Sequence, residues 1–388
     1  MKSTIPRAVV ERGVWEIKVF KNNLNKLLEV AEKEKLETII VFGEANLAYL
    51  TSYRGYGFLV IKEEQATLYV PLMECLRALD EASRVASIKA YTRVVSEPLH
   101  SRYGIPVVEG RVQDIVKQIL ANAKGKVGIT LASIPASTLD TMIKSDDKKR
   151  IVDISEKILA LRSVKEEWEV NMIREATRIT EKAIARSLDY IREGMRDYEL
   201  AGIITREMYW GGAQALAFNP IVAIGPNSAY PHAYPSGHKV RKHSVIVIDV
   251  GCIYKNYCSD MTRTVLLNPE KTEMLLLEEV ELAYNDALSA LKHGVEASEP
   301  YAAALRRFVL RRHQAHFTHS LGHGLGVEVH EKPTLSLFSE EKLARNMVVT
   351  VEPGLYFPGA YGFRIENPVV ITENGALELG SLDKIIVL

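Results

Sequence analysis

Hydrophobic positions in the first 150 residues alternate between helical and extended patterns. Residues 16–34 carry them at the spacing of one helical face. Short apolar runs of the kind that form strands occur at 38–42, 58–61, 66–70 and 127–130. Because alternating helices and strands are typical of a sheet covered by helices, we predict a smaller α/β domain over residues 1–155.

A long periodic segment marks the start of a second predicted domain, over residues 156–388. It follows a polar stretch at 144–150, and we expect a helix that begins at Ser163 and ends at Gly194. Ser163 and Glu166 have the spacing of a capping box, and glycine often follows a helix end. Further helices are predicted at 197–210, 272–291 and 299–314. Since two pairs of strand-like runs lie between these helices, the domain is predicted to be α+β, a helix-flanked antiparallel sheet.

The first pair of strand-like runs carries two aspartates. Residues 245–250 read Val-Ile-Val-Ile-Asp-Val, a β-branched run suited to a buried strand, with Asp249 near its end. After a polar turn at 254–256, a second apolar run follows Asp260. An antiparallel return would place Asp260 beside Asp249.

The second pair repeats this arrangement with two glutamates. Glu352 lies in the middle of an apolar run at 347–357, and residues 358–362 supply turn-forming proline and glycine. The chain then returns through Glu366. Glu352 and Glu366 are equidistant from Gly359, so we expect them to face each other.

Four carboxylates within apolar strand pairs require compensating charge. Removing one such ion from water costs several kcal/mol in practice. A single acid could be paired with Arg263, Arg364 or a surface lysine. Two matched pairs of carboxylates are explained better by bound divalent cations.

A histidine-rich segment at 319–333 offers a nitrogen ligand. It contains His319, His323 and His330, and nine of the ten histidines of the chain lie after residue 230. Glycines at 322, 324 and 326 permit close backbone approach and positive φ around His323. The segment has neither the spacing of a dinucleotide-binding loop nor the second histidine of a zincin helix. We therefore predict that His323 joins the four carboxylates.

The composition excludes several other classes of protein. Forty-nine Lys and Arg balance 49 Asp and Glu without long single-sign blocks, so no nucleic-acid or membrane partner is expected. No run approaches 18 apolar residues, and the first residues lack the apolar core of a signal peptide. Cys75, Cys252 and Cys258 form no zinc-site pattern and are expected to be reduced. We expect a cytoplasmic location.

The order of these residues resembles a known family. Asp249 and Asp260, then Gly-His-Gly around His323, Val-Glu-Pro-Gly around Glu352 and Arg-Ile-Glu ending at Glu366, is similar to the creatinase-fold ("pita-bread") dinuclear metallopeptidases. Within that family the chain looks most like Xaa-Pro dipeptidases (prolidases) and Xaa-Pro aminopeptidases. The resemblance is strong over about residues 160–388 and weak over 1–150.

The resemblance implies a role for each residue. Asp249 would bind one divalent ion, Asp260 and Glu366 would bridge two, and His323 with Glu352 would complete the second site. His232 matches a histidine that reaches toward the scissile carbonyl, His319 and His330 match histidines that line the substrate site, and Arg364 matches an arginine that steadies the bridging acids. The family also implies a homodimer and a proline-containing peptide as substrate.

The ligands themselves suggest the chemistry. Two ions that share an oxygen can lower the pKa of water toward neutrality, which would give a metal-bridging hydroxide that attacks a peptide carbonyl. By resemblance, Glu352 would carry the proton, while His232 and His330 could donate hydrogen bonds. Carboxylates with one imidazole suit Mn, Co, Fe or Zn. Possible walls of a proline pocket are Phe218, Tyr230, Pro231 and Tyr356.

Departures from the family pattern leave alternatives open. Asn219, Asn346 and Asn367 stand where relatives often carry other residues, and Thr334 stands where some prolidases place an arginine that receives the substrate carboxylate. The favoured function is hydrolysis of Xaa-Pro dipeptides. The alternatives are an Xaa-Pro aminopeptidase acting on longer peptides, a methionine aminopeptidase-like enzyme, and a non-catalytic scaffold. Creatine hydrolysis is disfavoured because all five metal ligands are kept.

Overall fold

The computed structural model describes residues 7–93, 104–143 and 149–388, and the chain divides into two compact units, Met1–Arg162 and Ser163–Leu388. We predicted this division near residue 155. The helix α7 (Ser155–Ser163) lies mostly within the first unit, to which it is tied by a hydrogen bond from the Arg162 guanidinium to the Asn46 side chain. Most of the polar stretch at 144–150 lies outside the described residues.

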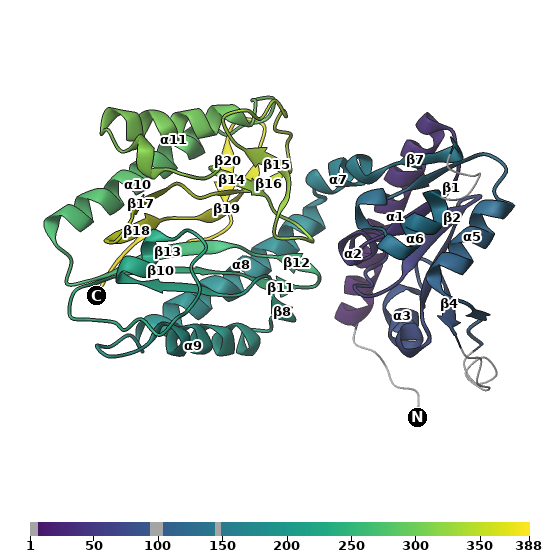
Figure 1. Ribbon diagram of the computed structural model, residues 1–388, viewed down its shortest axis with the longest axis horizontal. Coiled ribbons are helices and arrows are strands. Elements are labelled where there is room, and N and C mark those ends of the chain that lie inside the picture. Colours follow the sequence, from purple (N-terminus) through teal and green to yellow (C-terminus); the bar gives the residue numbers. More distant parts are fainter. Residues whose placement is uncertain (1–6, 94–103, 144–148) are drawn as a thin grey trace. The chain divides into compact units, whose positions relative to one another are not determined.

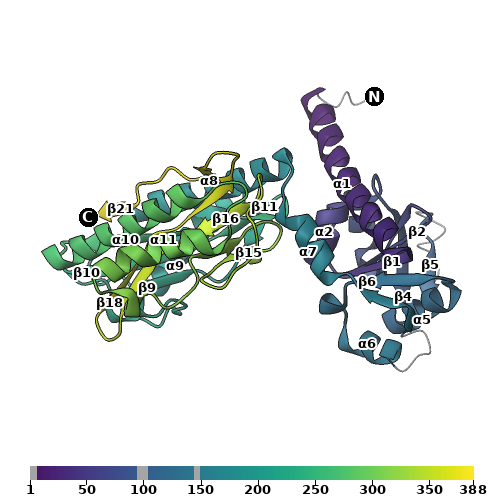
Figure 2. The ribbon, with the colours of Figure 1, turned by 90° about the horizontal axis from the view of Figure 1, so that it is seen from above.

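The first unit is built on one mixed sheet, with strand order β5-β4-β3-β2-β1-β6-β7 (Figures 1 and 2). Its strands are β1 (Leu36–Phe42), β2 (Phe58–Lys62), β3 (Gln65–Pro71), β4 (Ser87–Thr92), β5 (Val107–Glu109), β6 (Lys126–Ile129) and β7 (Ile151–Asp153). Its other helices are α1 (Arg7–Glu34), α2 (Glu44–Thr51), α3 (Cys75–Ala82), α5 (Val112–Asn122) and α6 (Ala136–Ile143), with 3-10 turns η1 (Leu72–Glu74) and η2 (Leu131–Ser133). The α/β prediction for this part is confirmed.

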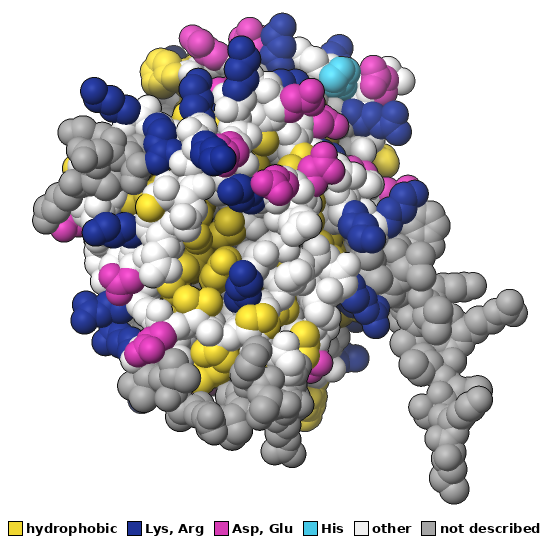
Figure 3. Space-filling view, turned by 90° about the vertical axis from the view of Figure 1, so that its right-hand side faces the viewer, with side chains coloured by type: hydrophobic (Ala, Val, Ile, Leu, Met, Phe, Trp, Pro, Cys, Tyr) yellow, Lys and Arg dark blue, Asp and Glu magenta, His cyan; other side chains and the backbone are white. Residues whose placement is uncertain are grey.

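The core of the first unit follows the strand period. Ile40 and Phe42 of β1 pack with Val116 and Leu120 of α5 on one face of the sheet. The four strands predicted from apolar runs are present. Strand β4 was missed because polar residues interrupt its apolar ones, and β5 and β7 were missed because each has only three residues. The face of the molecule in Figure 3 carries acidic and basic side chains interspersed, with hydrophobic ones exposed between them.

The second unit contains four small sheets rather than one continuous sheet. Their strand orders are β21-β13-β10-β9, β12-β11-β8, β15-β14-β16-β19-β20 and β17-β18. The strands are β8 (Ala215–Leu216), β9 (Ile221–Ile224), β10 (Ser244–Val250), β11 (Cys252–Tyr254), β12 (Tyr257–Cys258), β13 (Met261–Leu267), β14 (Gly322–Gly324), β15 (Glu331–Leu335), β16 (Val348–Val351), β17 (Gly354–Phe357), β18 (Tyr361–Arg364), β19 (Asn367–Ile371), β20 (Ala376–Glu378) and β21 (Ile385–Val387).

Helices cover the outer sides of these sheets. They are α8 (Glu167–Leu188), α9 (Asp197–Trp210), α10 (Lys271–Ala290) and α11 (Ser298–Leu310), with 3-10 turns η4 (Gly225–Ala229) and η5 (Gln314–His316). One apolar core joins α8 and α9 to β10 and β13, and another joins α10 and α11 to strands β15 to β19. In Figure 1, α10 and α11 lie on one side of the strands and α9 on the other. The predicted α+β, helix-flanked arrangement is confirmed.

The start of α8 differs from the prediction. Its N-cap is Glu166, which forms a capping box with Glu169, so the capping box expected at Ser163 and Glu166 is wrong. The preceding residues are held extended because Val164 forms a β-bridge with Met347. The helix ends at Leu188, and the glycine expected at its end, Gly194, adopts positive φ in the following turn.

The remaining predicted helices lie close to their expected positions. The 197–210 prediction coincides with α9, and α10 is displaced by one residue from 272–291. The helix expected at 299–314 ends at Leu310, before the separate turn η5. None of the helices in the described part of the chain has the length and apolar character needed to cross a membrane.

Candidate metal centre

The aspartate hairpin contains an additional small hairpin. Strands β10 and β13 pair antiparallel, with Asp249 opposite Thr262 rather than Asp260. The strands β11 and β12 lie between them in sequence, and the turn at Lys255 and Asn256 has positive φ at both residues. Asp260 therefore precedes β13 and is offset from Asp249 along the sheet, so the expectation of directly adjacent aspartates is corrected. Both side chains still line one cavity.

The glutamate hairpin has the register expected from the sequence. Pairing of Val351 with Asn367 in β16–β19 and of Gly354 with Arg364 in β17–β18 follows one common alignment. Continued between the two ladders, this alignment places Glu352 opposite Glu366. Neither glutamate belongs to a strand, because the ladder is interrupted at these two positions. The prediction that they face each other is confirmed.

His323 enters the site between two glycines whose backbones are closely packed. A Cβ atom at Gly322 would overlap the carbonyl oxygen of Thr350, and one at Gly324 would overlap that of Lys332. Neither glycine has positive φ, so close approach alone explains them and the expected positive φ is wrong. Strand β14, which consists of these glycines and His323, is thereby held against β15 and β16.

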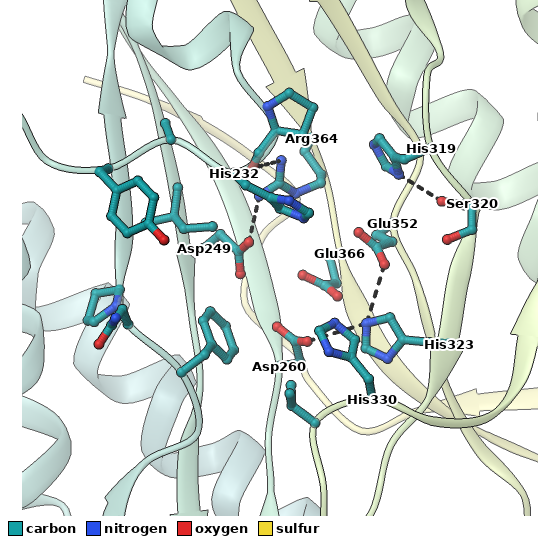
Figure 4. A pocket seen from close by; sticks show the side chains of 18 residues that line it. His232, Asp249, Asp260, His319, Ser320, His323, His330, Glu352, Arg364 and Glu366 are labelled. Carbon is teal, nitrogen blue, oxygen red and sulfur yellow. Dashed lines mark hydrogen bonds and ion pairs between the residues drawn. The ribbon is translucent and has the colours of Figure 1, made fainter. Parts of the chain in front are cut away.

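The predicted site residues converge on one cavity of about 530 Å³. Its lining includes Asp249, Asp260, Glu352, Glu366, His232, His319, His323, His330 and Arg364. Figure 4 shows the four carboxylates turned toward one another, with the ring of His323 beside them. Possible ligand atoms of Asp260, His323 and Glu366 all lie within 4.8 Å of one another.

The imidazole of His323 is set up as an electron-pair donor. Its Nδ1 lies 3.1 Å from the carbonyl oxygen of Gly324, which assigns the ring proton to Nδ1. Its Nε2 lies 3.6 Å from an oxygen of Asp260 and 3.5 Å from one of Glu352. Burial and the neighbouring His330 lower the pKa of His323 to about 4, so the ring is neutral near pH 7. A neutral nitrogen lone pair that faces two carboxylates fits a bound cation between them.

The four carboxylates that line the cavity have too few positively charged neighbours to balance their negative charges. Burial and the charge of Asp249 raise the pKa of Glu366 to about 8. Burial and the charge of Glu366 raise the pKa values of Asp260 and Glu352 well above their ordinary range. Among the described residues that line the cavity, Arg364 is the only Lys or Arg. The donor set therefore fits divalent metal ions, which would supply the missing charge.

Arg364 forms an ion pair with Asp249. Its Nη2 donates to Asp249 Oδ2 at 2.6 Å, while its Nη1 donates to the Tyr356 hydroxyl at 2.8 Å. The other carboxylate oxygen of Asp249, Oδ1, is buried and has no hydrogen-bond partner within the described part of the chain. That orphaned oxygen is a further acceptor suited to a cation.

Two threonine hydroxyl groups, which were not predicted from the sequence, orient the ligands. Thr262 donates to Glu366 Oε2 at 2.7 Å, and Thr350 lies 3.4 Å from Glu352 Oε1. The Thr350 hydroxyl also accepts from the backbone N–H of His323. Thr262 could have been suspected from its position two residues after Asp260, but the pairing of Thr350 with two ligands depends on tertiary structure.

Tyr356 links Arg364 to His319. Its hydroxyl lies 2.9 Å from His319 Nε2, and the Nδ1 of His319 donates to the carbonyl oxygen of Ser320. Burial and the charge of Arg364 lower the pKa of His319 to about 4, so this ring is also neutral. Tyr356 is not among the residues that line the cavity, and neither is Tyr230, whereas Phe218 and Pro231 are.

His232 and His330 lie on the solvent-accessible side of the cavity. Both side chains are exposed, and the ring of His330 lies edge-on to that of His323 with centroids 4.3 Å apart. Figure 4 shows the ring of His232 beside Arg364. Burial of part of the ring and the charge of His232 lower the pKa of His330. These two histidines can reach a bound molecule without being ligands in the group formed by Asp260, His323 and Glu366.

Comparisons with known proteins identify the class. Residues 171–373 match Metallopeptidase family M24, and residues 23–164 match the Creatinase/Prolidase N-terminal domain. The first match covers more than half of the chain. The chain belongs to metallopeptidase family M24. The M24 match lies within the region of strong resemblance, and the second match extends the relationship to the first unit, where the sequence resemblance was weak.

Relatives of this M24 chain match it over nearly its whole length. The Xaa-Pro dipeptidase of Pyrococcus furiosus is 32% identical over 367 residues, which are 94% of this chain and 99% of that protein. The X-Pro aminopeptidase of Thermotoga maritima has a similar structure, with a TM-score of 0.84, 29% identity, and coverage of 94% of this chain and 99% of that one. The prolidase of Pyrococcus horikoshii has a TM-score of 0.82 and 30% identity at the same coverage. Members of the family use divalent metal ions.

Proposed function

We propose that this protein is an Xaa-Pro dipeptidase that uses two divalent metal ions. The observation that carries the proposal is the cavity in which four carboxylates face one neutral imidazole, with one arginine among the lining residues to balance them. The near-complete alignment with Xaa-Pro dipeptidases supports the choice of substrate.

The five ligands divide between two ion positions in this proposal. Asp249 would hold one ion, His323 and Glu352 would hold the other, and Asp260 and Glu366 would contact both. When bound, the ions would lower the pKa of water toward neutrality and stabilise negative charge that develops on a peptide carbonyl oxygen. Mn, Co, Fe and Zn all suit this donor set.

The chain's own groups would handle protons and orientation. Glu352 is the proton carrier in this proposal, as the family resemblance implies, because its carboxylate lies beside His323 at one of the two ion positions, within reach of a metal-bound water. His232 and His330, exposed at the cavity, would donate hydrogen bonds to the substrate and to the tetrahedral species. His319 is held neutral beside Tyr356 and would contact the substrate as an uncharged ring.

The cavity also offers an apolar surface for a proline ring. Phe218 and Ile221, before and at the start of strand β9, line it, as do Pro231 and Tyr234. A rigid ring placed against such a surface loses little conformational freedom on binding. We therefore assign the proline specificity to these apolar lining residues.

A second candidate is an Xaa-Pro aminopeptidase that accepts longer peptides. It is favoured by the structural similarity to the Thermotoga maritima X-Pro aminopeptidase and by Thr334, which cannot pair with a dipeptide carboxylate as an arginine could. A homodimer and a cytoplasmic location stay predictions that derive from the resemblance and the composition.

The test is a substrate panel for metal-stripped protein reconstituted with Mn or Co. Ala-Pro and Met-Pro represent dipeptides, Ala-Pro-Ala a longer substrate, and Met-Ala-Ala a methionine aminopeptidase substrate. Hydrolysis confined to the two dipeptides is the expected result. Cleavage of Ala-Pro-Ala before proline would establish the aminopeptidase instead, and turnover of Met-Ala-Ala alone would overturn both. The Asp260→Ala protein, treated in the same way, controls for contaminating peptidases.

A further inference from the structure

A buried ion pair lies outside the metal centre, within the second unit. Lys165 Nζ is 3.0 Å from Glu331 Oε2, and both side chains are only 1% exposed. The same ammonium donates to the carbonyl oxygen of Ser163 at 3.1 Å. Lys165 and Glu331 are 166 residues apart in sequence, so the pair joins the segment before α8 to the segment that carries His330.

The Glu331 carboxylate organises the turn at 326–331. Its Oε1 accepts a hydrogen bond from the backbone N–H of Glu328 at 3.2 Å. A Cβ atom at Gly326 would overlap the Glu331 carboxylate, so only glycine leaves room for it there. Gly326 in turn donates its N–H to the carbonyl oxygen of Glu328. The carboxylate therefore occupies the inside of the turn.

This turn determines where His330 lies. Glu331 is adjacent to His330 in sequence and pairs with Gly324, the residue after His323. His330 itself is exposed, so packing contributes less to its position than it does for a core side chain. A displacement of Glu331 would shift the His330 backbone directly and would change its edge-on contact with His323.

The lysine is fixed on its own side by backbone contacts. The backbone N–H of Lys165 donates to the carbonyl oxygen of Asn346 at 3.1 Å, and Val164 forms a β-bridge with Met347. These residues directly precede β16, which leads to Glu352. The Lys165 ammonium therefore has a fixed position, and its ion pair with Glu331 holds the turn at 326–331 in place.

We propose that Lys165 and Glu331 are positioning residues that fix His330 at the cavity. Apolar side chains of similar volume could fill the same space, so the reason for a charged pair is its directional geometry. The expected effect on turnover rests on the proposed function. Its structural part concerns the order of the 326–331 turn and does not depend on which peptide is cleaved.

The kinetic test is a double-mutant cycle between Lys165→Met and His330→Ala, measured on metal-loaded protein with Ala-Pro. Lys165→Met alone should lower kcat by about 10- to 100-fold, the usual scale for groups that orient an active-site residue, with metal content unchanged. In the His330→Ala background the same change should have little further effect, because the group that it positions is absent. Equal losses in both backgrounds, or no loss in either, would overturn the proposal.

A matched control is available one residue after Glu331. Lys332 forms an exposed ion pair with Glu341 at 3.7 Å, with side chains 39% and 44% exposed. Lys332→Met removes a lysine from the same segment but leaves the buried pair intact. It should retain kcat within about twofold, since exposed pairs contribute little.

Hydrogen–deuterium exchange separates this inference from the proposed function. Amides of residues 324–331 should exchange faster in Lys165→Met than in wild type or Lys332→Met, whatever the enzyme cleaves. Unchanged exchange would overturn the positioning role, whereas a wild-type protein inactive on Ala-Pro would overturn only the proposed substrate. If Lys165→Met does not fold, Glu331→Gln serves, because the amide keeps the shape and one acceptor; it should raise exchange of the same amides, and unchanged exchange would again overturn the role.

Discussion

The aspartate hairpin and the glutamate hairpin carry their charges differently. Asp249 of the first receives an arginine hydrogen bond at 2.6 Å from Arg364. Glu352 and Glu366 of the second face each other, and threonine hydroxyls are their hydrogen-bond donors among the described residues. An ion pair within the protein therefore accounts for one carboxylate, and the need for a cation is greatest where Glu352 and Glu366 meet Asp260 and His323.

Arg263 does not neutralise the carboxylates of the metal centre. It is fully buried, but its guanidinium donates to the carbonyl oxygens of Thr262, Glu366, Leu382 and Asp383 and to the side-chain oxygen of Asn367. These acceptors are all neutral. Among the four carboxylates of the metal centre, only Asp249 is therefore paired with an arginine.

The largest expected effect comes from removing the Asp260 carboxylate, which belongs to the aspartate hairpin but lies close to Glu366 of the glutamate hairpin. Asp260→Ala should release metal and abolish turnover, because Asp260 lies with His323 and Glu366 in the candidate ligand group. Metal content and Ala-Pro hydrolysis measured on one sample check this. Asp286→Ala, at a half-buried ion pair with Arg307 outside the cavity, is the control and should change neither. A metal-replete, active Asp260→Ala protein would contradict the bridging role.

Replacing one glutamate of the second hairpin should separate proton transfer from metal binding. Glu352→Gln keeps the side-chain shape, and kcat should fall by at least ~10²-fold if Glu352 carries the proton. The comparison is made at saturating Mn, with the exposed Glu373→Gln as control. Near-normal turnover of the Glu352→Gln protein would assign the proton to another group.

His330 should matter for turnover but not for metal. His330→Ala is expected to lower kcat by about 10- to 100-fold, on the scale of a lost hydrogen bond to the transition state, with full metal content. His243→Ala, at an exposed histidine outside the cavity, should be silent. Loss of metal from the His330→Ala protein would show that His330 is itself a metal ligand. The ligand set would then not be limited to the two hairpins and His323.

The smallest expected effect is the pH dependence of the metal-free protein's stability. Glu366 has a folded-state pKa of about 8, above that of the unfolded chain, so the folded protein holds an extra proton and loses stability as pH rises toward 8. His319 and His323, with pKa values lowered to about 4, have the opposite effect, but only below about pH 6.5. Between pH 6.5 and 8 the carboxyls should dominate.

Chemical denaturation of stripped protein tests this window. The free energy of unfolding should fall by about 1 to 2 kcal/mol between pH 6.5 and 8 for one such group, and added Mn should stabilise more at the higher pH. Glu366→Gln should flatten the slope. Stability that does not fall over this interval would mean that the glutamates are already ionised without metal, which would remove the contrast between the hairpins.

The sequence predicted the candidate ligands because strand period and turn position determine which side chains face each other. Glu352 and Glu366 could be aligned about Gly359 without knowledge of the fold. The offset of Asp260 could not be foreseen, because β11 and β12 form a hairpin of their own within the polar turn. Local pattern was sufficient for one hairpin and insufficient for the other.

Long-range contacts account for the other differences. Ser163 has the sequence pattern of an N-cap, but the bridge between Val164 and Met347 keeps the chain extended, so α8 begins only at Glu167. Asn346, noted as a departure from the family pattern, adopts a left-handed φ of 66°, which asparagine tolerates, and its carbonyl oxygen accepts a hydrogen bond from the backbone N–H of Lys165. Asn367, another departure, uses its amide to join Arg263 to Glu378. No local pattern indicates such partners.

The most direct test of the metal centre is to count the ions. Inductively coupled plasma mass spectrometry of protein that has been stripped, reloaded with Mn and desalted should find about two ions per chain in the wild type. The same treatment of Asp260→Ala should find fewer than one, while Asp286→Ala should match the wild type. A wild-type protein that retains no metal would contradict a dinuclear site formed by these carboxylates and His323, and so would an Asp260→Ala protein that retains both ions.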